Sequence, residues 1–330
     1  MDDNVRMSSI ASVRIHASQF PENVRRDLLA SLRARRVNHK FHYDSVKQTQ
    51  KWLALHQQYS PTRNDADCLA IYEKSFVAAA AQIASPQIHV VGLGCGGGQK
   101  DARLLKLLAA SGKEISYTPC DVATAMVLVA RQTALAVVPG KKCFPFVCDL
   151  AVADDLPVSL LTPHVSLITF FGMIPNFEPE VILPKLASLV RPHDWLLFSA
   201  NLAPGDNYSA GVRKILPQYD NAPTREWLLT FLLDLGVERN DGTLDFQIET
   251  DAVTGLQRVA AHFRFQRPRW IEVESERFEF VSGDSIQLFF SYRYTPERAR
   301  AALAEHGLEI CESWIAASEE EGVFLCRKDR

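Results

Sequence analysis

Apolar residues in the middle of the chain form short continuous runs, and segments with helical spacing separate these runs. Such runs, without polar alternation, are typical of strands that are buried on both faces of a sheet. Alternation of these strands with helices predicts an α/β fold built on a parallel sheet. The expected strands are 88–91, 115–120, 143–148, 165–171 and 195–200, and the expected helices between them are 101–108, 124–136 and 180–190.

The two flanks of this pattern differ from it. Before it, apolar spacing predicts amphipathic helices at 21–35 and 65–83, with an irregular aromatic and polar segment between them. After residue 201 the chain holds one helix and then alternating segments that are typical of antiparallel strands. These later elements are expected at 224–235, 256–266, 270–280 and 285–290, followed by a helix at 296–306 and a strand pair at 308–314 and 322–328.

Composition excludes several classes of protein. The chain has 330 residues, of which 47% are hydrophobic, enough for one large or two ordinary domains. A formal net charge of −3 gives no sign of the positively charged surface that binds nucleic acid. Residues 1–13 are polar and lack the apolar segment of a signal peptide, and no run of about 18 apolar residues could span a membrane. We therefore expect a cytoplasmic protein.

The cysteines give no sign of a metal site. Their number, seven, is odd, and they are scattered without a CxxC pair, so neither a zinc site nor a disulfide framework is predicted. We expect most of them to be reduced core residues.

A glycine-rich turn, Gly92 to Gly98, joins the first expected strand of the sheet to a helix. Glycine permits positive φ in such a turn and lets a nucleotide approach the backbone closely. Asp121 ends the next strand, where a carboxylate can accept hydrogen bonds from ribose hydroxyls. Asp149 closes a further strand, and in a nucleotide site of this kind it would contact the adenine amino group.

The turn is compatible with a dinucleotide or with S-adenosylmethionine. Its spacing is Gly-x-Gly-x-Gly-Gly-Gly, which is not a clean GxGxxG. Two successive strands end in acidic residues, and a helix and strand pair follow the sheet, as is typical of class I methyltransferases. These features favour S-adenosylmethionine, with S-adenosylhomocysteine as product.

Five motifs, in order, resemble those of the histidine-specific methyltransferase family, the EgtD-like enzymes that trimethylate the α-amino group of histidine. They are Tyr59–Arg63, the glycine turn through Lys100, Tyr117–Val122, Phe170–Pro179 and Ser291–Glu297. The resemblance implies a class I Rossmann-like parallel sheet with a second, α+β substrate-binding lobe. The implied division is a flexible arm at 1–16, a substrate-binding lobe at 17–62 and 201–288, and a methyltransferase domain at 63–200 and 289–330.

The resemblance also implies roles for individual residues. Tyr43 would lie near the substrate amine, where its phenol oxygen, directly or through one water, could accept the lost proton. Asn176 and Tyr219 would hold the substrate carboxylate, and Tyr59 and Ser291 would surround the substrate side chain. The residues implied to bind the cofactor are Gly92, Gly94, Gly96, Lys100, Asp121 and Asp149.

Two positions depart from the family pattern. Gly92 stands where the family turn begins with an acidic residue, which removes a possible contact to the methionine amino group of the cofactor. Phe289 stands where histidine-selective members place a glutamate. A phenyl ring cannot accept a hydrogen bond from an imidazole N–H, and an unpartnered buried imidazole would cost roughly 1–3 kcal/mol. Phe289 therefore argues against histidine and favours a larger or less polar aromatic amino acid.

The sequence thus predicts an S-adenosylmethionine-dependent N-methyltransferase that acts on the α-amino group of an amino acid or related small amine. No metal, nucleic acid, membrane or obligate protein partner is expected. Two alternatives remain open at this point: a nicotinamide-dependent oxidoreductase, which the glycine turn permits, and a catalytically inactive methyltransferase-like protein, which Gly92 and Phe289 permit.

Overall fold

The computed structural model describes residues 11–60, 64–154, 156 and 165–329. Its largest element is an eight-stranded sheet with the strand order β1-β4-β3-β2-β5-β6-β13-β12. All neighbours from β1 to β6 are parallel, whereas β13 is antiparallel to both β6 and β12. The strands are β1 Arg14–Ile15, β2 Gln87–Leu93, β3 Glu114–Asp121, β4 Phe146–Val147, β5 Val165–Phe171, β6 Trp195–Asn201, β12 Leu308–Ile315 and β13 Glu321–Lys328.

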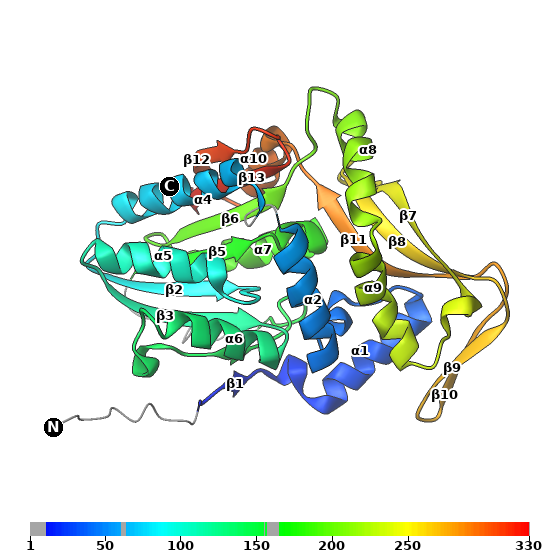
Figure 1. Cartoon of the computed structure of the whole chain (residues 1–330). Helices are drawn as coiled ribbons and strands as arrows, with labels where there is room; N and C mark the ends of the chain where they lie inside the picture. The colour runs from blue at the N-terminus through cyan, green and yellow to red at the C-terminus, as the bar shows by residue number, and fades with distance from the viewer. Residues whose placement is uncertain (1–10, 61–63, 155, 157–164, 330) are drawn as a thin grey trace.

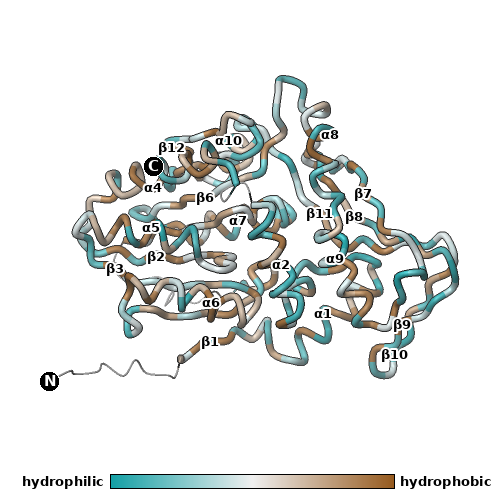
Figure 2. Tube along the Cα trace, in the orientation of Figure 1, coloured by the Kyte–Doolittle hydropathy of each residue, from teal (hydrophilic) through white to brown (hydrophobic). Residues whose placement is uncertain are grey.

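Helices cover both faces of this sheet (Figure 1), as the continuous apolar runs predicted. One core lies between the sheet and helices α4 and α5, and the other lies against α7 and α10. Figure 2 shows the hydrophobic residues in the middle of the sheet and alternating colours along α5. The helices beside the sheet are α4 Ala66–Gln82, α5 Gln99–Ala110, α6 Thr124–Ala134, α7 Pro179–Leu189 and α10 Pro296–Ala304.

A second group of elements packs beside the carboxyl ends of the central strands (Figure 1). Its three-stranded antiparallel sheet has the order β11-β8-β7, and a separate hairpin pairs β9 with β10. Helices α1 and α9 enclose its core together with these strands. The elements are α1 Pro21–Ala34, α2 Val46–Tyr59, α8 Tyr208–Tyr219, α9 Ala222–Asp234, β7 Gly242–Thr250, β8 Gln257–Phe265, β9 Arg269–Val273, β10 Glu276–Phe280 and β11 Ser285–Arg293.

The expected helices and strands agree with the structure except in five places. Helices α2 and α8 and strands β1 and β7 were not predicted, and the expected strand at 270–280 is the β9–β10 hairpin. Helix α2 is polar over most of its length, so its few apolar residues do not form a clear helical pattern in the sequence. In the hairpin, Glu274 reverses the chain with φ 53°, a conformation that the alternation of residues does not reveal.

Two of the expected domain boundaries can be compared with the observed strands. The boundary between 288 and 289 falls inside β11, which runs as one strand from Ser285 to Arg293 and pairs with β8 along its length. Within the expected arm, Arg14 and Ile15 form β1 at the edge of the large sheet. Residues 1–10, and the boundary at 62/63, lie outside the described residues.

Candidate active site

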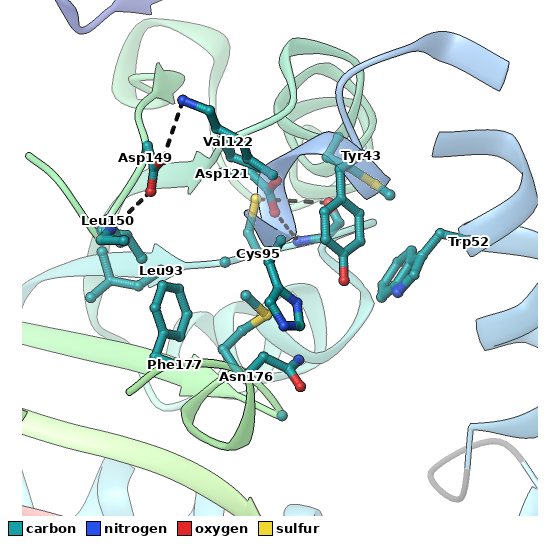
Figure 3. A pocket seen from close by; sticks show the side chains of 18 of the residues that line it. Tyr43, Trp52, Leu93, Cys95, Asp121, Val122, Asp149, Leu150, Asn176 and Phe177 are labelled. Atoms are coloured by element: carbon teal, nitrogen blue, oxygen red, sulfur yellow. Dashed lines mark hydrogen bonds and ion pairs between the residues drawn. The ribbon is translucent and has the colours of Figure 1, made fainter. Parts of the chain in front are cut away.

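A cavity of about 870 Å³ opens at the carboxyl ends of β2, β3 and β5, where parallel sheets of this kind bind ligands. The glycine turn after β2 and the residues that end β3 and β5 form one side of it. The 3-10 helix η2, His39–His42, and helix α2 border the other side. The cavity therefore lies between the large sheet and the second group of elements (Figure 3).

Two glycines of the turn are required by their geometry. Gly94 and Gly96 have φ values of 58° and 50°, in the left-handed region that favours glycine. A Cβ atom on Gly94 would lie 2.6 Å from Cγ of Met173, and one on Gly96 would lie 3.0 Å from the ring of Trp52. The turn therefore lies closely against both neighbours and presents its backbone to the cavity.

Asp121 holds the glycine turn in place. Its carboxylate accepts hydrogen bonds from the backbone N–H groups of Gly96, at 3.0 Å, and Ala123, at 3.1 Å. The side chain lines the cavity and is only 8% exposed. Burial raises the pKa of Asp121, while the backbone N–H groups oppose this shift. Each carboxylate oxygen retains acceptor capacity, as an interaction with ribose hydroxyls requires.

Asp149 also lines the cavity, at the end of β4. Its Oδ1 accepts a hydrogen bond from the backbone N–H of Ala151, whereas its buried Oδ2 has no hydrogen-bond partner among the described residues. Lys40 Nζ lies 3.5 Å from Oδ2 and 2.5 Å from a carboxylate oxygen of Asp27. An acceptor oxygen in this position suits an adenine amino group, which is a donor.

Lys100 lines the cavity at the start of α5. Its ammonium donates to the Tyr72 hydroxyl at 2.7 Å, and Tyr72 in turn donates to a carboxylate oxygen of Glu321 at 2.5 Å. Burial lowers the pKa of Lys100, and the nearby Glu321 carboxylate opposes this shift. Lys100 therefore brings a partly compensated cation to the cavity wall.

Tyr43 and Asn176 line the same cavity, from η2 and from the 3-10 helix after β5, Ile174–Asn176. Figure 3 shows both side chains in the same pocket as Asp121. Within the described part of the chain, neither the phenol nor the side-chain amide makes a hydrogen bond. Burial, together with the Asp121 charge, raises the pKa of Tyr43, so the phenol stays protonated at neutral pH.

Four other residues expected around the acceptor do not line the cavity. Tyr219 donates to the Ser291 hydroxyl at 2.9 Å, and its ring centroid lies 6.0 Å from that of Phe289. These three residues form one group that is separated from the cavity by His39. His39 lines the cavity, and its ring centroid lies 5.1 Å from that of Phe289. Tyr59, which is 45% exposed, ends α2 beside the residues that the structure does not describe.

Side chains alternate between the two faces of β11, and the β11 residue in the cavity wall is Phe290. The guanidinium groups of Arg36 and Arg258 lie 4.9 and 5.0 Å from the centre of its ring. Sequence reasoning also missed Trp52, which lines the cavity and lies 5.9 Å from Tyr43 between ring centroids. No local motif marks these residues, because only the packing of distant segments brings them to the cavity.

Within the described ranges, no helix is long and apolar enough to cross a membrane. The same ranges contain no group of three or more His, Cys, Asp or Glu side chains that could hold a metal ion.

The sheet, with its reversed strand β13, and the glycine turn with acidic strand ends define a class I S-adenosylmethionine-dependent methyltransferase. The family model described as "Histidine-specific methyltransferase, SAM-dependent" matches residues 24–328, and the chain belongs to this family. The resemblance drawn from the motifs is thereby confirmed, as are the methyltransferase class of the enzyme and its cofactor, S-adenosylmethionine. The nicotinamide alternative is wrong.

Among curated proteins no significant match was found. Solved structures that the chain resembles include an S-adenosylmethionine-dependent methyltransferase from Clostridium acetobutylicum ATCC 824, with 12% identity, a TM-score of 0.48, and coverage of 85% of this chain and 99% of that one. Another is magnesium protoporphyrin IX methyltransferase from Synechocystis PCC 6803 with bound SAH, with 13% identity, a TM-score of 0.47, and coverage of 88% and 98%.

Proposed function

We propose that the protein transfers methyl groups from S-adenosylmethionine to the α-amino group of an amino acid or a related small amine. The observation that carries this proposal is that one cavity contains both the glycine turn with Asp121 and the unpartnered polar groups of Tyr43 and Asn176. Both side chains are half-buried in the cavity wall, where the phenol and the amide are free to form hydrogen bonds with a polar ligand. Residues 17–60 contribute His39, Tyr43 and Trp52 to the acceptor side of the proposed site, whereas of residues 201–288 only Asn201 lines the cavity.

The roles of the residues follow from their chemistry. S-adenosylmethionine supplies an electrophilic methyl group, so the protein must present an unprotonated amine to it and exclude water. This positioning can contribute up to roughly 7–11 kcal/mol to lowering the barrier. The phenol of Tyr43, which stays protonated, accepts a hydrogen bond from the amine N–H and orients the amine lone pair toward the methyl group. The proton of the methylated ammonium leaves to water, while the Asn176 amide donates to the acceptor carboxylate.

The walls of the cavity support an acceptor with an aromatic or apolar side chain. Trp52, Phe177 and Phe290 all line the cavity. Phe289, at the position where histidine-selective members place a glutamate, is 7% exposed and offers no acceptor for an imidazole N–H. We propose that histidine is a poor acceptor and that an aromatic amino acid is a better one.

A labelled-methyl assay over all amino acids and common biogenic amines tests this function. The expected result is transfer to at least one amino acid with an aromatic side chain, at a kcat/KM well above that for histidine. Efficient trimethylation of histidine would contradict the proposed specificity. Cofactor binding without transfer to any amine would instead support the catalytically inactive alternative.

The acceptor role of Asn176 has a separate test. Asn176→Ala should raise KM for the acceptor at least about tenfold, because it removes a hydrogen bond to a charged carboxylate. Affinity for S-adenosylhomocysteine, measured by titration calorimetry, should stay within about twofold of the parent protein. The matched control is Asn240→Ala, at an exposed position outside the cavity. A fall in cofactor affinity in the Asn176 variant would show that the acceptor role is misplaced.

A further inference from the structure

The space beside Gly92 is filled by a carboxylate from another element. A Cβ atom on Gly92 would overlap Oδ2 of Asp101 and would lie 3.0 Å from the hydroxyl of Tyr117. Gly92 is where the family turn begins with an acidic residue, so a side chain at this position would enter the volume that the Asp101 carboxylate now takes. Asp101 belongs to the first turn of α5 rather than to β2.

Side chains of two strands fix the Asp101 carboxylate. Tyr117, on β3, donates its hydroxyl hydrogen bond to Oδ2 at 2.6 Å. Thr169, on β5, donates to Oδ1 at 2.8 Å. Asp101 is 3% exposed and lines the cavity. Helix α5 and both neighbours of β2 therefore meet at one carboxylate, which leaves it little freedom to move.

This buried carboxylate has no ion-pair partner in the described part of the chain. Its sequence neighbour Lys100 directs its ammonium to Tyr72. Burial raises the pKa of Asp101, whereas the hydrogen bonds from Tyr117 and Thr169 and the charge of Lys100 favour the ionised form. A buried charge is costly unless it is paired, so a cationic ligand group at this end of the cavity would stabilise it.

We propose that Asp101 is a cofactor-positioning residue that replaces the missing carboxylate at position 92 and binds the α-ammonium group of the methionine part of S-adenosylmethionine. In this chain the acidic contact has moved from the end of β2 to the first turn of α5. The replacement explains how a glycine at position 92 is compatible with cofactor binding. It rests on the cofactor site of the proposed function and is independent of the identity of the acceptor.

Another carboxylate in the cavity wall has different surroundings. Glu321 lines the cavity, but it accepts from Tyr72, which in turn accepts from the Lys100 ammonium. The charge of Glu321 is therefore already compensated by a neighbouring cation. Asp101 has only neutral hydroxyl donors, and this difference selects it as the ammonium site.

Titration calorimetry with two ligands tests the proposal. S-adenosylhomocysteine carries the amino-acid group, whereas 5′-methylthioadenosine has the same nucleoside and sulfur without it. Asp101→Asn should weaken S-adenosylhomocysteine binding at least about tenfold, because a hydrogen bond to a charged group is lost. Binding of 5′-methylthioadenosine should change less than about twofold. The matched control is Asp67→Asn, a first-turn acid of α4 outside the cavity, which should change neither affinity.

A double variant moves the carboxylate to the family position. Gly92→Asp alone should weaken S-adenosylhomocysteine binding, because its side chain meets the Asp101 carboxylate. Gly92→Asp combined with Asp101→Thr should recover affinity to within about threefold of the parent protein.

The proposal would be overturned if Asp101→Asn weakened the binding of both ligands equally, or if it left the affinity for S-adenosylhomocysteine unchanged. It would also be overturned if Glu321→Gln, and not Asp101→Asn, weakened the binding of S-adenosylhomocysteine alone. Failure of the parent protein to bind S-adenosylhomocysteine would instead overturn the cofactor site as a whole.

Discussion

Asp121 combines an observed structural role with a predicted role in cofactor binding. Its place at the end of a strand predicts a ribose acceptor, and the structure shows that Asp121 also holds the glycine turn through Gly96. A substitution there therefore acts on two properties at once, and an experiment must measure both.

Asp121→Ala should weaken S-adenosylhomocysteine binding at least about a hundredfold, because hydrogen bonds from two ribose hydroxyls to a carboxylate are lost. It should also lower the free energy of unfolding by about 1–3 kcal/mol, because two backbone N–H groups lose their acceptor. Calorimetry and urea denaturation measure the two effects. Asp206→Ala, at an exposed position, is the control. Unchanged cofactor affinity would remove Asp121 from the cofactor site.

Neighbouring residues of β11 allow a paired test of specificity. Phe289→Glu should raise the ratio of kcat/KM for histidine to that for the best acceptor at least about tenfold, since a carboxylate can accept from an imidazole N–H. Phe290→Glu places a carboxylate on the opposite face of the strand, beside the guanidinium groups of Arg36 and Arg258, which would pair with it in place of an imidazole N–H, so it should not raise this ratio. The ratio is insensitive to the amount of folded enzyme. An increase in the Phe290 variant alone would place the acceptor side chain on the other face of β11.

Sequence reasoning named residues that follow a strand or belong to a motif, and of these Asp121, Asp149 and Asn176 line the cavity. It did not find Trp52 or His39, whose segments meet the glycine turn only in the folded chain. It interpreted Gly92 as a lost contact, because nothing in the sequence indicates that the Asp101 carboxylate occupies the space beside it. Residues that act through contacts between distant elements are the ones that local patterns cannot reveal.

At the scale of elements, the central strands of the large sheet, from β2 to β6, were predictable because most of their residues are apolar and buried, and a helix follows most of them. The second group of elements was less predictable. Its helix α9 has buried residues around most of its circumference. Helices α2 and α8 begin at side-chain caps, Ser45 with Gln48 and Asn207, which sequence reasoning missed because no continuous apolar run follows them. Their positions depend on burial against other elements, which propensity alone does not determine.

The short helix η2 makes stability sensitive to acid. Burial lowers the pKa of His39 to about 3 and that of His42 to about 4, and His42 Nε2 lies 2.6 Å from the Leu288 carbonyl oxygen. The unfolded chain binds protons at these imidazoles below about pH 6.5, whereas the native state stays neutral, so stability is full above that pH and falls as the pH is lowered. Each imidazole contributes a slope of about 1.4 kcal/mol per pH unit.

Urea denaturation between pH 7.5 and 4.5 measures this slope. His42→Asn should make it shallower by about 1.4 kcal/mol per pH unit, because one of the two buried imidazoles is removed. His193→Asn, at an exposed position, should leave it unchanged. An unchanged slope in the His42 variant would show that this imidazole is protonated in the folded protein.

At the scale of the whole molecule, an ion cluster joins the N-terminal segment to the large sheet. Lys40 has a side chain only 3% exposed and pairs with Asp27 of α1 and with Asp149 at the end of β4. The backbone N–H of Asp149 also donates to the hydroxyl of Ser18. The segment that covers the cavity is thus attached to the same strand end that is proposed to contact adenine.

Lys40→Met should lower the free energy of unfolding by about 3–5 kcal/mol, because it leaves two carboxylates without their buried cation. Lys47→Met removes a surface pair with Asp234, in which both side chains are largely exposed, and should cost at most about 1 kcal/mol. Urea denaturation of both variants at neutral pH gives the comparison. Equal effects would show that the Lys40 cluster behaves as an ordinary surface pair.

The place of β13 between β6 and β12 has a consequence for how the chain is made. A ribosome releases residues in order, so β6 at Trp195–Asn201 emerges long before Glu321–Lys328, which forms its neighbour. During that interval the hydrogen-bonding groups along one side of β6 have no strand beside them, and open strand edges promote aggregation. The nascent chain therefore carries this open strand edge while residues 202–320 are being synthesised.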